Sequence, residues 1–144
     1  MAKQYNLERF LKAQESDYSQ ALSEIRNGRK QSHWIWFVFP QIAGLGSSVT
    51  SKFYAIEDLA EAGQYLDHPV LGKRLVEISR ALAEFNGRTA NQILGSPDDL
   101  KVKSCMTLFN ALENTNPVFQ EVLEKYFDSV EDRKTLELIN HADH

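Results

Sequence analysis

The sequence contains one cysteine, seven glycines and four prolines among its 144 residues. The single thiol, Cys105, excludes an internal disulfide framework and any zinc site built from several cysteines. Few glycines and prolines leave few positions for tight turns, which argues against an all-β or loop-rich design. These shortages favour a fold built from helices that are joined by short connections.

Long apolar runs are also missing. The longest covers residues 34–39, far short of the roughly 20 residues that span a bilayer. Residues 1–10 carry no apolar core of the signal-peptide type. We therefore expect a soluble, cytoplasmic protein with no membrane partner. The length, together with 42% hydrophobic and 25% charged residues, predicts one globular domain over residues 1–144.

Helix caps and apolar stripes with a 3.6-residue period recur along the chain and predict a compact all-α domain of about seven to nine helices. Asn6, and then Ser16 or Asp17, are candidate caps for two separate N-terminal helices. Residues 33–39 fit either a buried strand or a short buried helix, because periodicity cannot separate the two over so few residues. Further helices are predicted at 49–55, 58–66, 69–85, 89–93, 96–113, from 116 onward, and at 132–139.

Charged and aromatic residues are unevenly distributed along a chain whose net charge is −4. Residues 25–56 contain no Asp or Glu, but they include four basic residues and six of the fifteen aromatics. These are Arg26, Arg29, Lys30, Lys52, Trp34, Trp36, Phe37, Phe39, Phe53 and Tyr54. Basic and aromatic side chains together suit a planar, anionic ligand. The alternative is that the aromatics mark the core and that the missing acids are a matter of chance.

A second candidate region is the predicted helix start at residues 96–99, Ser-Pro-Asp-Asp. A serine cap, a proline at the first helical position and two acids suit the positive end of the helix dipole. Lys101 and Lys103 do not suit that end, and an anion bound beside the free N–H groups would remove the conflict. The alternative is that both lysines are solvated and paired with Asp98 or Asp99.

Residues suited to catalysis are few. The chain has no Gly-rich phosphate loop, no HExxH, no GxSxG and no EF-hand motif, and its four histidines lie far apart. We therefore expect no metal site and no cofactor. If a bond is cleaved, Asp99 is the better carboxylate, because Lys103 at i+4 can hold it ionised, and His33 is the candidate acid. The alternative is that Asp99 and His33 are purely structural, at the start of a helix and at the start of the buried segment. Cys105 is expected to be an inert core thiol.

These observations predict one pocket formed by residues 29–41, by the Lys52–Tyr54 region and by the first turn of the helix that starts at Ser96. The partner would be a small, anionic, nucleotide-like molecule; the sequence carries no strong nucleic-acid signal and leaves the oligomeric state open. The candidate ligand-binding residues are Arg29, Lys30, His33, Trp34, Trp36, Gln41, Lys52, Tyr54, Ser96, Lys101 and Lys103.

Three segments carry a family resemblance. They are residues 28–41, GRKQSHWIWFVFPQ, which continue through Gly44-Leu45-Gly46; residues 65–75, YLDHPVLGKRL; and residues 95–101, GSPDDLK, which run on to MTLF at 106–109. Over roughly residues 6–139 the chain resembles a bacterial family catalogued as domain of unknown function 1810. Some members carry a calpastatin label, but nothing in this sequence resembles a calpain-inhibitory repeat. The resemblance implies no activity.

A weaker similarity extends to the NADAR family, through the order of a Tyr-centred helix, a His-Pro helix, a Lys-rich helix and an Asn-Pro helix. That resemblance implies a small helical protein that binds or hydrolyses an ADP-ribosyl or related N-glycosidic compound. The chain has no counterpart of the family's acidic-then-Trp-Gly segment, since residues 128–144 contain no tryptophan. The alternative function is a non-enzymatic protein-interaction module, with the aromatic segment inside and an outer face that binds a partner.

Overall fold

The first helix, α1 (Glu8–Arg26), is one continuous element, so the prediction of two N-terminal helices is wrong. Ser16 and Asp17 contact each other on the outer side of this helix and do not cap a second one. The region of the predicted break is tied to the core by two buried side chains. Gln14 donates from Nε2 to the carbonyl of Phe37 at 2.6 Å, and the Tyr18 hydroxyl donates to the carbonyl of Arg74 at 2.9 Å. Tertiary contacts therefore keep the helix continuous where local sequence favours a boundary.

The computed structural model describes residues 4–142, without the side chains of 141 and 142, and over this range the chain forms nine helices and no strand. The predicted all-α class is confirmed. After α1 come α2 (Ile35–Val38), α3 (Val49–Phe53), α4 (Leu59–Asp67), α5 (Leu71–Glu84), α6 (Ala90–Leu94), α7 (Asp98–Asn110), α8 (Val118–Phe127) and α9 (Arg133–Ala142).

Polar side chains cap several of these helices. Asp58 accepts from the Glu61 amide at 2.9 Å, and Thr89 and Gln92 form a reciprocal capping box. Two predicted starts are wrong. α5 begins at Leu71 instead of at residue 69, because His68 holds the chain there: its ring Nδ1 accepts from the backbone amides of Val70 and Leu71 at 3.1 and 3.2 Å. α7 has Pro97 at its N-cap position, so Ser96 lies before the cap.

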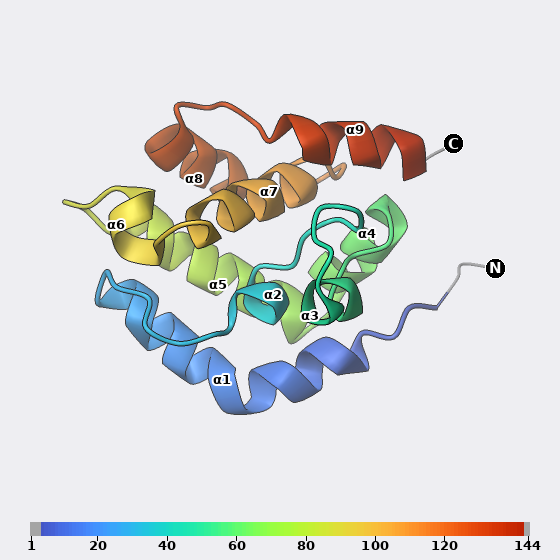
Figure 1. Ribbon diagram of the computed structural model, residues 1–144, viewed down its shortest axis with the longest axis horizontal. Helices are drawn as coiled ribbons and strands as arrows, with labels where there is room; N and C mark the ends of the chain where they lie inside the picture. The colour runs from blue at the N-terminus through green and yellow to red at the C-terminus, as the bar shows by residue number, and fades with distance from the viewer. Residues whose placement is uncertain (1–3, 143–144) are drawn as a thin grey trace.

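The helices form one compact domain around α5, which runs through the middle of the view in Figure 1 with α1 below it and α7 above. α8 packs on both α5 and α7, while α9 packs on α7. A row of aromatic rings joins these layers through the core. The ring centroids are 5.1 Å apart for Phe10 and Tyr65, 5.5 Å for Tyr65 and Phe109, and 5.8 Å for Phe109 and Phe119. The core is therefore continuous from α1 to α8.

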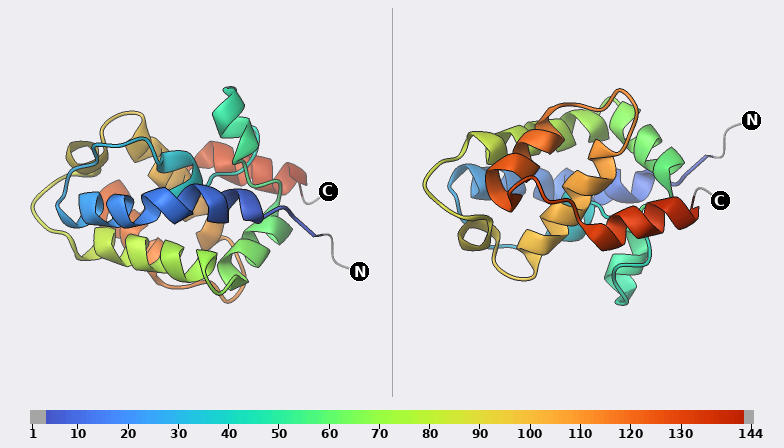
Figure 2. Two further views of the ribbon diagram at one scale, coloured as in Figure 1. Left: turned by 90° about the horizontal axis from the view of Figure 1, so that it is seen from below. Right: turned by 90° about the horizontal axis from the view of Figure 1, so that it is seen from above.

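The segment between α2 and α4 determines where a pocket forms. Residues 35–38, which fitted either strand or helix, form the short buried helix α2. The chain then leaves the core and returns to it, and Ile42 and Ile56 are held side by side by an isolated parallel bridge. Between them lies α3, which buries none of its residues and projects from the body of the molecule in both views of Figure 2. α3 therefore stands beside the core as a separate wall.

Candidate ligand-binding site

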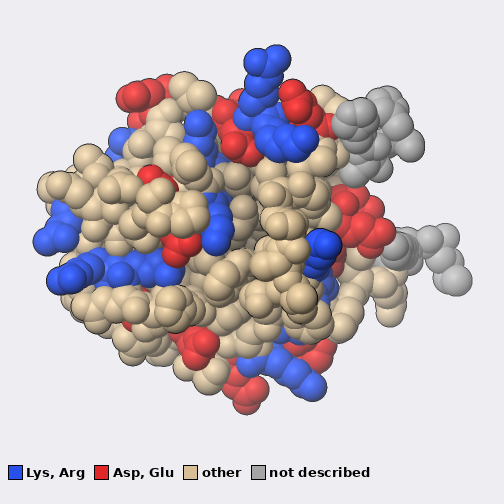
Figure 3. Space-filling view, viewed as in Figure 1, with Lys and Arg blue, Asp and Glu red and all other residues tan. Residues whose placement is uncertain are grey.

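A pocket of about 450 Å³ lies between α2, the loop that follows it, α3 and the first turn of α7. This volume is within the usual range for small-molecule sites, roughly 300–1,000 Å³. The face that carries α2 and α3 is turned toward the viewer in Figure 3, where its middle is largely uncharged and Lys and Arg side chains lie to either side. The pocket is lined by Trp36, Gln41, Ile42, Ala43, Gly44, Leu45, Gly46, Ser47, Ser48, Ser51, Lys52, Tyr54, Ala55 and Lys101.

Four lining side chains carry polar groups that have no partner among the described residues. They are the indole N–H of Trp36, the amide of Gln41, the ammonium of Lys52 and the hydroxyl of Tyr54, none of which makes a hydrogen bond or an ion pair within residues 4–142. All four groups can donate a hydrogen bond, and the Lys52 ammonium is also positively charged. No Asp or Glu lines the pocket. The lining therefore suits a ligand that is rich in acceptor atoms and negatively charged.

Lys101 supplies the second cation of the lining. Its ammonium lies 5.0 Å from the ring centroid of Trp36 and 3.5 Å from Oδ1 of Asp98. The other oxygen of that carboxylate, Oδ2, is 2.8 Å from the ammonium of Lys30. One carboxylate is thus shared between two lysines, which leaves an excess positive charge at the edge of the pocket.

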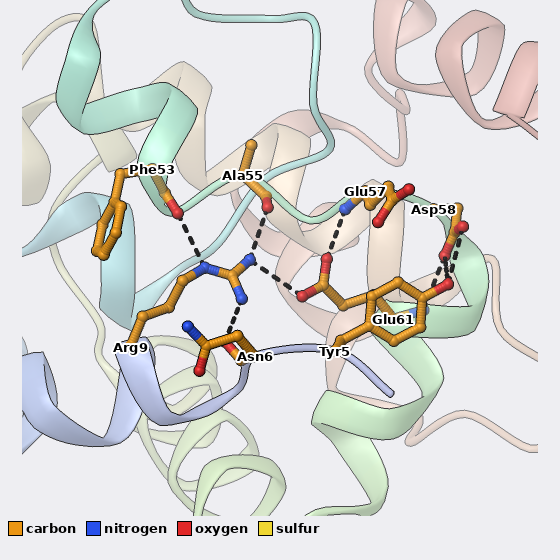
Figure 4. A network of polar contacts seen from close by, with 8 residues as sticks. All are labelled: Tyr5, Asn6, Arg9, Phe53, Ala55, Glu57, Asp58 and Glu61. Carbon is orange, nitrogen blue, oxygen red and sulfur yellow. Dashed lines mark hydrogen bonds and ion pairs between the residues drawn. The ribbon is translucent and has the colours of Figure 1, made fainter. Parts of the chain in front are cut away.

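Arg9 holds the wall that α3 forms (Figure 4). It donates from Nε to the carbonyl of Phe53 at 2.8 Å and from Nη2 to the carbonyl of Ala55 at 2.9 Å, at the end of α3. Its charge is matched by Glu61, whose Oε2 lies 3.0 Å from Nη2 and whose side chain is 2% exposed. The other carboxylate oxygen of Glu61 accepts from the Glu57 amide at 2.7 Å. α1 and α4 together therefore fix the point where α3 rejoins the core.

Beside this cluster, the hydroxyl of Tyr5 donates to both carboxylate oxygens of Asp58, at 2.9 and 3.0 Å. Burial and this neighbouring carboxylate raise the pKa of Tyr5 to about 12, so the phenol stays protonated and keeps donating at neutral pH. Because Asp58 also caps α4, the contact ties the segment before α1 to the first turn of α4.

Glu24 organises the loop that leads into α2, and no sequence pattern singled it out. It is 4% exposed, and its carboxylate accepts hydrogen bonds from four residues. The donors are the Gln31 amide at 2.7 Å, the Ser32 amide and hydroxyl at 3.0 and 2.7 Å, the Trp34 indole at 2.9 Å and the Gln20 side chain at 2.8 Å. Burial alone would raise the pKa of Glu24, but these donors outweigh it and lower the pKa to about 2.

The structure brings five of the eleven predicted ligand-binding residues together in the pocket lining: Trp36, Gln41, Lys52, Tyr54 and Lys101. Lys30 lies behind the lining, paired with Asp98. Trp34 is buried in the core at 1% exposure. Arg29, His33 and Ser96 are exposed and Lys103 is half-buried, and none of these four is part of the lining.

The residues suggested for bond cleavage also lie outside the lining. Asp99 accepts from the Leu100 amide at 2.9 Å and from the side chain of Asn91 at 3.4 Å. No ion pair joins Asp99 to Lys103 among the described residues, although the two are spaced i, i+4. Asp99 therefore serves the start of α7, and the geometry does not bring it to the pocket with His33.

Sequence reasoning missed the serines of the α3 wall. Ser48 caps α3 by accepting from the Ser51 amide at 3.1 Å, and the two hydroxyls are 3.0 Å apart. Both residues line the pocket, together with Ser47. The available signal was the Ser47-Ser48 pair, which directly follows Gly44 and Gly46 in the loop before α3.

Other kinds of site find no support in the part of the chain that the structure describes. No group of three or more His, Cys, Asp or Glu side chains in it is arranged to hold a metal ion. The Cys105 thiol is buried, and burial raises its pKa well above the ordinary value, so this thiol is unreactive. Within the described helices, none combines the length and the apolar character needed to cross a membrane.

Similarity to known proteins covers nearly the whole chain. Residues 4–139 match the family described as "Protein of unknown function (DUF1810)". The fold is similar to the crystal structure of the conserved hypothetical protein Rv1873 from Mycobacterium tuberculosis, with a TM-score of 0.93 and 45% sequence identity; the match covers 94% of this chain and 97% of that chain. No curated protein matches the sequence. Neither description names a ligand or a reaction.

Proposed function

Because the chain belongs to the DUF1810 family, whose description assigns no activity, we propose a function from the site itself: the protein binds a small, anionic, nucleotide-like molecule in the pocket beside α3. The observation that carries the proposal is the set of unpartnered polar groups in the lining, on Trp36, Gln41, Lys52 and Tyr54. None of these side chains is buried, so water satisfies their polar groups in the free protein, and the groups are available to an acceptor-rich ligand that displaces this water.

The charge of the lining favours an anion. Lys52 on α3 and Lys101 on α7 contribute two positive charges, and no carboxylate lines the cavity. Asp98, which is not part of the lining, lies near Lys101, but its charge is also matched by Lys30. A phosphate is a suitable anion, because lysines bind it as point charges and hydroxyl and amide donors complete its hydrogen bonds.

The aromatic part of the lining suits a planar group on the same molecule. Trp36 and Tyr54 both line the cavity, and both are half-buried. Small-molecule sites commonly combine apolar and aromatic walls with a few polar groups that fix orientation. A nucleotide carries both the planar base and the phosphate, and an ADP-ribosyl compound is the specific candidate that the NADAR-like segments suggest.

Binding is better supported than hydrolysis. Hydrolysis of an N-glycosidic bond needs a group that activates water or protonates the leaving group. Asp99 and His33, the residues suggested by sequence, are not in the lining, and no other Asp, Glu or His takes their place there. The proposed role is therefore a binding protein or sensor for this class of molecule.

A thermal-shift screen with ADP-ribose, NAD and AMP tests the proposal, with isothermal titration calorimetry of any compound that raises Tm. A compound present at 100 times its Kd should stabilise the folded state by roughly 2.7 kcal/mol. Unchanged melting curves with all three compounds would contradict the proposal. Parallel product analysis by chromatography separates binding from turnover, and release of a base from NAD or ADP-ribose would show that hydrolysis occurs.

Matched variants locate the binding site. Lys52→Met removes one lining cation and retains an apolar stem of similar length, and it should weaken AMP binding about tenfold. Lys134→Met makes the same charge change at an exposed position at the start of α9 and should leave binding unchanged. Equal losses in the two variants would show that only net charge matters and that the pocket is not the site.

A second candidate, the protein-interaction module, is favoured by one observation. On α3, Val49 is 87% exposed and Phe53 is 55% exposed, although both are apolar, and α3 projects from the body of the molecule. Apolar side chains placed together on a projecting element suit a protein partner. Flat melting curves with the three anions, together with loss of a partner after Phe53→Ser, would favour this candidate over the first.

A further inference from the structure

We propose that Lys30 and Asp98, which lie outside the pocket lining, determine how strongly Lys101 binds an anion, and that they do so with opposite sign. This inference rests on the proposed function and adds two positioning residues to it. The relevant geometry is one carboxylate between two ammonium groups: Asp98 Oδ2 lies 2.8 Å from Lys30 Nζ, and Asp98 Oδ1 lies 3.5 Å from Lys101 Nζ.

The two lysines are held very differently. Lys30 is the fixed partner: its side chain is 8% exposed, its ammonium also donates to the Ser32 carbonyl, and it lies 5.0 Å from the ring centroid of Trp34. Its backbone amide donates to the carbonyl of Ile93 at 2.7 Å, which fixes the start of the side chain as well. Lys30 therefore remains with Asp98 whether or not the pocket is occupied.

Lys101 is the loosely held partner. Its side chain is 27% exposed, its distance to the carboxylate is longer, and it lines the pocket over the Trp36 ring. Because Lys30 already matches the charge of Asp98, Lys101 can turn toward an anion in the pocket without leaving this partly buried carboxylate unpaired. If Lys101 were the only partner of Asp98, its movement toward the anion would leave the carboxylate unpaired, and this cost would oppose anion binding.

Opposite effects follow for the two positioning residues. Without Lys30, the full charge of Asp98 acts on Lys101, and an anion in the pocket must compete with it. Without the charge of Asp98, Lys101 has no competing carboxylate and binds the anion more strongly. A molecule without a negative charge gains nothing from Lys101 and should respond to neither change.

The test is a double-mutant cycle with AMP and adenosine as probes, followed by isothermal titration calorimetry. Lys30→Met should weaken AMP binding about fivefold and Asp98→Asn should strengthen it about threefold, as expected for single charge pairs near a surface. Adenosine binding should change less than about twofold in either variant. Lys134→Met is the charge-matched control, and Lys30→Arg should restore AMP binding because it keeps the charge beside Asp98.

The decisive arm repeats both changes in a Lys101→Met background. If Lys30 and Asp98 act through Lys101, neither change alters AMP binding there. Effects that persist in that background would overturn the inference, because they would arise from the general field of the protein. If Lys30→Met does not fold, the Asp98→Asn change in the two backgrounds decides the question alone. Wild-type protein that binds neither AMP nor ADP-ribose contradicts the proposed function, whereas binding with persistent effects contradicts only this inference.

Discussion

The indole N–H of Trp34 lies 2.9 Å from Oε1 of Glu24, and this contact places the tryptophan in the core instead of the pocket. The same carboxylate accepts from the Gln31 and Ser32 amides, so one side chain of α1 shapes the chain that leads into α2. Trp36, two residues later, therefore becomes the indole that lines the pocket. Glu24 is thus a structural requirement for the site without belonging to it.

Replacement of Glu24 by glutamine should destabilise the protein by about 2–4 kcal/mol. Glutamine has an NH₂ group in place of one carboxylate oxygen, and this group cannot accept the hydrogen bonds that the surrounding residues donate. The free energy of unfolding from urea titration measures this. Glu15→Gln, at an exposed position of the same helix, should change that free energy by less than about 0.5 kcal/mol. A similar loss in both variants would show that the Glu24 network is not the cause.

The contribution of Glu24 should also depend on pH. Its pKa falls from the ordinary 4.5 to about 2 in the folded protein, so its stabilising effect is fully present above about pH 5 and is lost as the pH falls through 2. The difference in unfolding free energy between wild type and Glu24→Gln should therefore narrow as the pH is lowered from 7 to 3. A difference that stays constant over this range would contradict the depressed pKa.

Removal of the Arg9 guanidinium should loosen the α3 wall. Arg9→Met leaves Glu61, which is 2% exposed, without its charge partner and frees the Phe53 and Ala55 carbonyls. We expect a loss of about 3 kcal/mol in unfolding free energy and weaker AMP binding, measured by urea titration and calorimetry. Arg133→Met removes an arginine whose side chain is 91% exposed and should change neither quantity.

The hydroxyls of Tyr54 and Tyr65 should have separable roles. The Tyr54 hydroxyl has no partner among the described residues, so Tyr54→Phe should weaken AMP binding about fivefold, at the level of one hydrogen bond, and leave Tm nearly unchanged. The Tyr65 hydroxyl is buried and accepts from Gln14 at 2.9 Å, so Tyr65→Phe should lower Tm and leave the affinity for AMP unchanged. Identical behaviour of the two variants would remove Tyr54 from the proposed site.

Two glycines should respond to alanine in opposite directions. A Cβ on Gly72 would lie 1.8 Å from the Leu66 carbonyl oxygen, so Gly72→Ala forces α4 and α5 apart and should cost about 3 kcal/mol or more. On Gly63, inside α4, a Cβ would meet only the Leu112 side chain at 4.0 Å. Gly63→Ala should therefore stabilise the protein by up to about 1 kcal/mol through helix propensity. Chemical denaturation of both variants provides the comparison.

Local signals in the sequence were sufficient for the helical class and for most helix positions. Thr89 and Asp58 cap the helices that the sequence predicts at 89–93 and 58–66, because a cap needs only its own side chain and the next turn of backbone. Local signals failed where distant residues intervene. α1 continues through Ser16 because Gln14 is held by Phe37 and Tyr65, which are remote in sequence.

The candidate site divides in the same way. The acid-free, aromatic window and the lysines of α7 are properties of the sequence itself, and five residues chosen from them line one pocket. Which members of the window face that pocket was decided only by tertiary packing. Trp34 and Trp36 have the same chemistry, but Glu24 on α1 binds the first in the core, while the short helix α2 leaves the second at the surface beside Lys101. A sequence specifies the chemistry of each side chain, whereas its exposure and its partners depend on segments that folding brings from elsewhere in the chain.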